Sequence, residues 1–268
     1  MRSTSNPAFR NLPVGGGGYA GFNTAPAGLG GVQPGYAGAP TTVGRPMTID
    51  DVVTKTGLTL AILMATGAVT YFVGRENPVI WGLALPAALV GFVLALVIIF
   101  KKVVSPPLIL TYAAVEGVFL GGISGFIGSY VGNPGIIFQA IAGTGLVFAG
   151  MLVVYRTGAI RVTPRFTKWL IGAMIGVVGL MIINLIAGFF VEGGLGLRDG
   201  GPLAIIFSLV CIGVAAFSFL LDFDAADHAI RAGAPEKTAW YIAFGLTVTL
   251  VWLYLEILRL LSYFQGGE

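Results

Sequence analysis

Four carboxylates stand inside long apolar stretches or at their ends, where a charged side chain needs a specific reason to be. Glu116 lies within ILTYAAVEGVFLGGISG, Asp222 and Asp224 within LLDFDAADHAI, and Glu256 within TVTLVWLYLEILRLLSYF. An acid deep in a bilayer costs at least ~2.5 kcal/mol by insertion scales, so it faces the protein interior, a water-filled cavity or a partner. Carboxylates in this setting are typical of ion or proton paths.

Each acid also has a purely structural interpretation. Glu116 fits a protonated carboxyl that hydrogen-bonds a neighbouring helix. Glu256 stands three residues before Arg259, on the same face of a helix, so the two side chains can form an ion pair. Asp222, Asp224 and Asp227 fit a solvated helix end. Residue type and spacing do not decide between these structural roles and a role on an ion path.

Two enzymatic interpretations are tested by geometry. Residues 122–125, GISG, look like the serine motif of rhomboid proteases, and His228 is the single histidine. A nucleophile and its base must lie within about 3 Å, but Ser124 and His228 are expected at opposite membrane faces. The GxGD motif of intramembrane aspartyl proteases, the P-loop and the dinucleotide fingerprint are absent. We therefore expect no enzymatic activity and no resident cofactor.

The composition predicts that these residues are carried by membrane-spanning helices. Of 268 residues, 56% are hydrophobic and 10% are charged, against roughly a quarter charged in ordinary soluble domains. Several apolar runs reach the roughly 18–20 residues that cross a bilayer as a helix, and they lack the alternation of barrel strands. We predict an all-α integral membrane protein, a bundle of seven transmembrane helices at about 57–74, 79–100, 106–131, 135–155, 168–191, 202–224 and 239–264.

The N-terminal segment differs from the rest. Residues 1–46 are rich in Gly, Pro and Ala, a composition that cannot bury enough surface to offset its ordering entropy. We expect a disordered tail at 1–46 and a seven-helix membrane domain at 47–268. Thr48 and Asp51 form the pattern of a capping box, which predicts that a helix begins there.

The distribution of basic residues predicts an orientation. Twelve Lys and Arg fall in the tail and the alternate loops that share its side, and three fall on the other side: Arg75, Arg198 and Arg259. By the positive-inside rule the N-terminus is cytoplasmic and, with seven helices, the C-terminus lies outside the cell membrane. The net charge of +3 is spread over loops, which argues against a nucleic-acid partner.

Three segments together resemble the Bax inhibitor-1 family, also called the transmembrane Bax inhibitor motif family. They are YAAVEGVFLGGIS, the Phe-Asp sequence near the end of the sixth apolar run, and LYLEILRLL in the seventh; the resemblance covers roughly 50–264. It implies seven helices and a calcium leak channel gated by pH, in which an acid of helix six and an acid of helix seven share a proton and close the pore. By position Asp224 or Asp222 is the helix-six acid, Glu256 the helix-seven acid, and Glu116 lines the path.

The resemblance also implies where calcium, as the permeating ion, would bind transiently. Carboxylate oxygens are suitable ligands for Ca²⁺, so Asp224 and Glu256 are the candidate ligands. Three departures are visible. The helix-seven acid is Glu instead of the usual Asp, Arg259 one turn away favours its charged form, and 32 residues separate positions 224 and 256. The two acids can touch if the sixth helix continues past Asp227 and the seventh begins several turns outside the membrane.

Two functions follow as hypotheses. The first is a pH-sensitive calcium leak channel gated by paired carboxylates, with Arg259 as an alternative latch on Glu256. The second is a non-conducting membrane factor that binds and modulates another membrane protein, such as a protease. A proton-coupled transporter is a third alternative.

Overall fold

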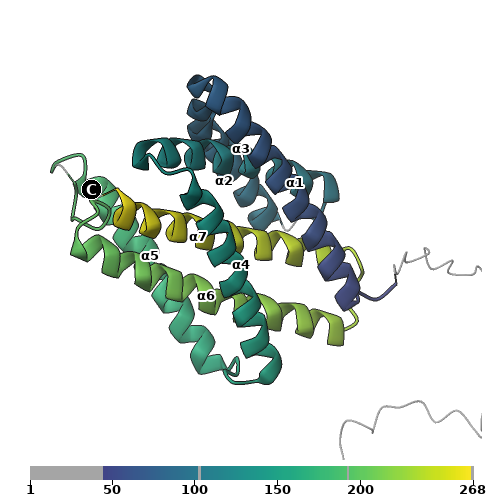
Figure 1. Ribbon diagram of the computed structural model, residues 1–268. Helices are drawn as coiled ribbons and strands as arrows, with labels where there is room; N and C mark the ends of the chain where they lie inside the picture. The colour runs from purple at the N-terminus through teal and green to yellow at the C-terminus, as the bar shows by residue number, and fades with distance from the viewer. Residues whose placement is uncertain (1–44, 102–103, 192, 267–268) are drawn as a thin grey trace, which may run out of the picture. The chain divides into compact units, whose positions relative to one another are not determined.

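The computed structural model describes residues 45–101, 104–191 and 193–266, and in this part of the chain all regular elements are helices (Figure 1). The long helices are α1 (Ile49–Glu76), α2 (Ala84–Lys101), α3 (Pro106–Val131), α4 (Gly135–Thr157), α5 (Pro164–Ala187), α6 (Pro202–Arg231) and α7 (Thr238–Gln265). A short 3₁₀ helix, η2 (Pro78–Leu83), leads into α2. With η2 counted into the second span, seven helices are long and apolar enough to cross a membrane, which confirms the predicted fold class. The tail predicted for 1–46 lies outside the described residues, apart from its last two.

The helix ends follow from local sequence signals. Thr48 caps α1 through the expected capping box, because its side chain accepts from the Asp51 backbone N–H and Asp51 accepts from the Thr48 N–H. Prolines occupy the first turns of α3, α5 and α6, where the missing N–H has no helical partner. Gly132 and Gly158 end α3 and α4 in the left-handed conformation. Two helices extend beyond the predicted spans: α1 begins before the 57–74 span, as the capping box predicted, and α6 continues past the predicted end at 224.

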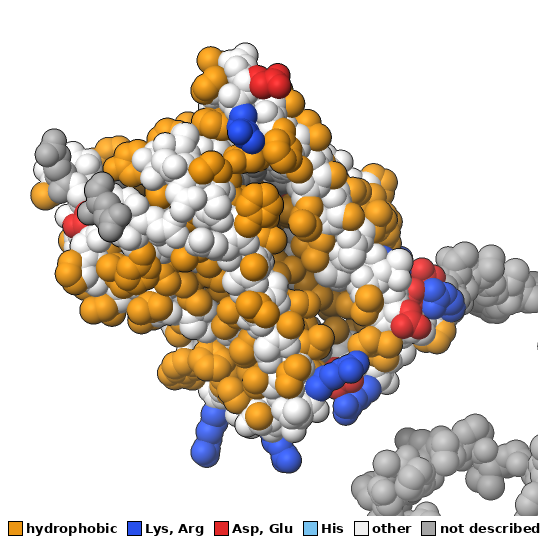
Figure 2. All heavy atoms as spheres, viewed as in Figure 1, with side chains coloured by type: hydrophobic (Ala, Val, Ile, Leu, Met, Phe, Trp, Pro, Cys, Tyr) orange, Lys and Arg blue, Asp and Glu red, His pale blue; other side chains and the backbone are white. Residues whose placement is uncertain are grey.

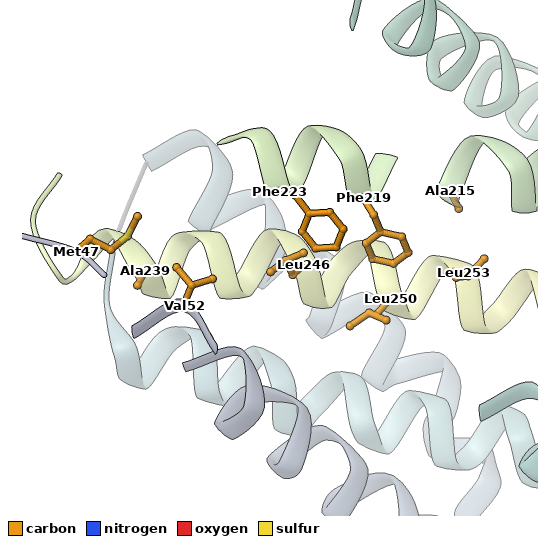
Figure 3. Packing of buried hydrophobic residues seen from close by; sticks show 9 residues of the cluster. All are labelled: Met47, Val52, Ala215, Phe219, Phe223, Ala239, Leu246, Leu250 and Leu253. Atoms are coloured by element: carbon orange, nitrogen blue, oxygen red, sulfur yellow. The ribbon is translucent and has the colours of Figure 1, made fainter. Parts of the chain in front are cut away.

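Helix α7 lies in the middle of the bundle and contacts α1, α3, α4 and α6 (Figure 1). Figure 3 shows part of this core, where Phe219 and Phe223 of α6 lie beside Leu246 and Leu250 of α7. The rings of Phe219 and Phe223 are stacked with centroids 6.1 Å apart. The centre of the bundle is thus an apolar contact between α6 and α7.

Small residues allow α1 and α3 to approach closely. A Cβ on Gly117 would overlap the Leu63 carbonyl and the Thr66 hydroxyl of α1, and a Cβ on Gly121 would overlap the Gly67 carbonyl. Close backbone approach at small residues is the usual way in which membrane helices associate. The contact holds α3, the helix that carries Glu116, in a fixed register against α1.

The outer surface is suited to lipid. Figure 2 shows hydrophobic side chains over the broad band between the helix ends, with the visible charged side chains gathered at those ends. Large exposed apolar side chains are frequent on α2 and α5, for example Phe92, Phe100, Ile175 and Leu185. This pattern is the inverse of a soluble surface and is expected for helices that face hydrocarbon.

Charged residues fasten the start of α1 to the loop between α6 and α7. Arg45 binds Asp51 at 2.6 Å and Glu236 at 3.3 Å, and Lys55 binds Glu236 at 3.0 Å. The hydrogen bond from Arg45 to Asp51 raises the pKa of the Arg45 guanidinium, so the pair stays ionised through neutral pH. A backbone hydrogen bond connects the same two segments, because the Met47 N–H donates to the Ala234 carbonyl at 2.8 Å.

Candidate functional site: acids within the helix bundle

Glu256 is a buried carboxylate held by two arginines. Its side chain is 2% exposed. Arg198 donates to it through both terminal nitrogens, Nη2 to Oε1 at 3.0 Å and Nη1 to Oε2 at 3.2 Å. Arg259 donates to Oε1 at 3.0 Å from one turn further along α7. The two-point contact with Arg198 is the stronger kind of ion pair, since planar guanidinium and carboxylate groups match in geometry.

Arg198 reaches Glu256 from the loop that joins α5 to α6. Four glycines of this loop have φ between +64° and +85°, namely Gly193, Gly194, Gly196 and Gly200, a conformation that side chains with a Cβ rarely adopt. Asn184 accepts the Leu195 N–H at 2.9 Å and so ties the loop to the end of α5. The guanidinium carbon of Arg198 lies 5.4 Å from the centre of the Phe207 ring, close enough for a favourable cation–π contact.

Asp222 faces α7 much further along the bundle. The Thr249 hydroxyl donates to Asp222 Oδ2 at 2.7 Å, and the Asp222 side chain is half-buried. Asp224 points elsewhere and contacts His228 on its own helix, with Nδ1 3.3 Å from Oδ2. The two aspartates that the sequence offered as alternatives therefore have separate surroundings, and Asp222 is the one in the α6–α7 interface.

Glu116 lies between α3 and α2. It is 9% exposed, and its Oε2 lies so close to Gly91 that a Cβ there would be 2.5 Å away. Gly91 is therefore the residue that makes room for this carboxyl. Among residues 45–101, 104–191 and 193–266, neither Glu116 nor Asp222 has a Lys, Arg or His within ion-pair distance.

The carboxylate pair expected between helices six and seven is not formed in this structure. Helix α6 does continue past Asp227, as the pairing required, but its Asp222 meets α7 at Thr249. Glu256 is seven residues further along α7, which corresponds to about 10 Å. The expected calcium ligands Asp224 and Glu256 are likewise apart, and no group of three or more His, Cys, Asp or Glu within the described residues could hold a metal ion.

Arg198 is the functional candidate that the sequence did not single out. It was one of three arginines assigned to the side opposite the tail, the same side on which Glu256 approaches the end of its helix. The ion pair with Arg259, by contrast, is the contact that the spacing predicted. Shared membrane side and opposite charge were the only signals that could have pointed to Arg198, and they do not fix which arginine pairs with the acid.

Ser124 and His228 take up unrelated positions. The Ser124 hydroxyl lies 2.7 Å from the Tyr254 hydroxyl and donates to the Leu120 carbonyl at 2.5 Å. His228 contacts Asp224 near the opposite end of the bundle. Each polar side chain is thus engaged with its own local partner.

The fold and these acids define a multi-pass membrane protein with ionisable groups inside a seven-helix bundle. The chain matches the family model described as Bax inhibitor 1 like over residues 6–266. It therefore belongs to the Bax inhibitor 1 like family. A comparison with curated proteins found no match.

Proposed function

We propose that the protein is a pH-sensitive calcium leak channel of the cell membrane and that the structure represents its closed form. The observation that carries the proposal is that two acids, Glu116 and Asp222, have no Lys, Arg or His within ion-pair distance in the part of the chain that the structure describes. Glu116 is ten residues from the start of α3, about 15 Å along the helix and near the middle of a ~30 Å hydrocarbon core. Asp222 lies two residues before the predicted end of the sixth span, in the interface between α6 and α7.

A structural acid buried among the helices should be neutralised by a neighbouring base. Glu256 satisfies that expectation through Arg198 and Arg259, and it shows that the chain can place arginines inside the bundle. Asp222 has a hydroxyl as its described partner, so a proton or a passing cation must balance its charge. Ionisable groups of this kind within a membrane mark ion and proton pathways by default.

In the proposed closed form, Glu256 and Arg198 act together as the latch. The α5–α6 loop that carries Arg198 is rich in left-handed glycines and is bound to α7 through this ion pair. Protonation of Glu256 would remove the charge that holds the guanidinium and release the loop. The latch thus replaces the carboxylate pair as the element that couples pH to opening.

The proposed channel has a defined orientation, a permeating ion and an immediate partner. The N-terminus is cytoplasmic and the C-terminus lies outside, because the basic residues are concentrated in the tail and in the loops on its side. Calcium is the permeating ion and the lipid bilayer is the immediate partner. The proposal assigns no catalytic chemistry and no resident cofactor.

The test is calcium flux into liposomes that contain the purified full-length chain, measured from pH 5 to pH 8. We expect wild-type flux above that of empty liposomes, and we expect Asp222→Asn to lower it most at the alkaline end, where an ionised carboxylate would attract Ca²⁺. Asp50→Asn is the matched control, since Asp50 is exposed in the first turn of α1. Equal flux for wild type and empty liposomes at every pH would overturn the proposal.

A second candidate function is favoured by one observation. Glu256 is buried and paired with both Arg198 and Arg259, which is what a membrane factor without a pore would need to hold its helices in register. Such a factor would bind and modulate another membrane protein. Absence of flux together with a stable, monodisperse protein would favour this function.

A further inference from the structure

A lateral groove opens between α1 and α4, whose Cα atoms stay more than 8 Å apart. Its floor is formed by α3 and α7, and its volume is about 430 Å³. The walls carry apolar and small residues, among them Met64 and Ala68 of α1 and Ile141 and Gly145 of α4. Figure 2 shows the apolar character of the face on which Figure 1 places α1, α4 and α7.

The groove has the length of one bilayer leaflet. Its lining residues on α1 run from Leu60 to Phe72, which spans about 18 Å at 1.5 Å per residue. Half of a ~30 Å hydrocarbon core is about 15 Å. The lining begins near the middle of α1 and approaches the end at Glu76, so the groove follows the direction of a lipid chain.

A polar hollow adjoins the groove at that end. Tyr71 lines both spaces, and the second hollow, of about 250 Å³, is also lined by Arg75, Trp81 and Ser129. Arg75 is exposed and has no ion-pair partner within the described residues. The Trp81 indole is fixed there, because it fills the space left by Gly74 and Gly125 and donates to the Tyr71 carbonyl at 3.4 Å. Tryptophan and arginine in this position are typical of the headgroup level.

We propose that this groove binds one phospholipid, with an acyl chain between α1 and α4 and the phosphate beside Arg75. A second membrane helix would fill an apolar groove equally well, but it would not need an unpaired cation at the rim. The volume of the groove also fits a single acyl chain. An apolar cavity of about 150 Å³ accepts the six carbons of benzene, so 430 Å³ corresponds to roughly 17 carbons by the same scale.

The test uses the full-length chain purified in detergent and titrated with dioleoylphosphatidylglycerol, with bound lipid counted by native mass spectrometry. Gly145 lines the groove and faces open space, so Gly145→Leu adds a side chain without a clash. Gly150 of the same helix also faces open space but does not line the groove, so Gly150→Leu is the matched control. We expect Gly145→Leu to weaken binding of the first lipid at least about tenfold, because it displaces several methylenes, and Gly150→Leu to leave it unchanged.

The contribution of Arg75, at the polar end of the groove, is tested separately. Arg75→Gln should weaken binding about two- to fivefold, the range of an exposed ion pair, whereas Arg156→Gln at the other end of α4 should not. Ala68→Leu on the α1 wall repeats the blocking experiment if Gly145→Leu is not monodisperse. Titration with dioleoylphosphatidylcholine should show the same losses, because the phosphate is common to both lipids. Equal losses in test and control variants would overturn the proposal, and so would a dimer that Gly145→Leu dissociates, since a second copy would then occupy the groove.

Discussion

Removing the charge of Glu256 should destabilise the protein more than removing either arginine. The carboxylate is 2% exposed and accepts from Arg198 twice and from Arg259 once. Glu256→Gln leaves two guanidinium groups without their anion, and breaking a buried pair in this way typically costs about 3–5 kcal/mol. Arg198→Gln should cost about 2 kcal/mol, because Arg259 still neutralises the acid. Arg259→Gln should cost about 0.5 kcal/mol, as expected for a neighbouring pair on one helix.

The assay is thermal unfolding of each variant in one fixed detergent. For a chain of this size each kcal/mol corresponds to a shift of roughly 2–4 °C in Tm. Glu256→Gln should therefore lower Tm by roughly 6–20 °C, and Arg198→Gln by roughly 4–8 °C. Arg156→Gln, an exposed arginine at the end of α4, serves as the control and should leave Tm unchanged.

The double variant Arg198→Gln with Glu256→Gln completes the cycle. Because the two side chains contact each other directly, the loss in the double variant should be smaller than the sum of the single losses by about 1–3 kcal/mol. Additive losses within about 0.5 kcal/mol would refute the reasoning. A wild-type Tm for Glu256→Gln would refute it as well, because the buried pair would then hold nothing together.

Three further predictions concern the scaffold. Gly117→Val should lower the free energy of unfolding by at least about 1–3 kcal/mol, because its Cβ overlaps the α1 backbone; an unchanged Tm would contradict the close contact. Asp51→Asn should cost about 0.5–2 kcal/mol by weakening the α1 cap and the pair with Arg45, and raising the salt concentration should narrow the difference in Tm. Tyr254→Phe should cost about 0.5–1.5 kcal/mol through loss of the Ser124 contact, and a Tm equal to wild type would count against that hydrogen bond.

The helices were predictable because membrane spans are set by length and hydropathy, which are local properties. The Thr48 capping box likewise fixed the start of α1 from four consecutive positions. Predicted ends differed where a helix continues beyond the membrane. The sixth span was expected to end at 224, but α6 reaches Arg231, since LDFDAADHAIR has good helix formers and no breaker.

The site was less predictable because it depends on the register between distant helices. The sequence identified Glu116, Asp222 and Glu256 as acids within spans and predicted the contact of Glu256 with Arg259, but it did not predict the partners Arg198 and Thr249. Asp222 contacts Thr249 across the α6–α7 interface. This pairing is set by the axial register of the two helices. The bond from Arg198 to Glu256 joins positions 58 residues apart through a glycine-rich loop, and such loop geometry leaves no periodic signal in the sequence.

The most direct test of the proposed latch is calcium flux at pH 7 through liposomes that carry Arg198→Gln, compared with wild type and with Arg156→Gln. If the Arg198–Glu256 pair holds the channel closed, Arg198→Gln should raise flux severalfold, and adding Asp222→Asn to the same chain should lower it again. Flux for Arg198→Gln no greater than wild type, in a protein that is folded and correctly inserted, would contradict the account.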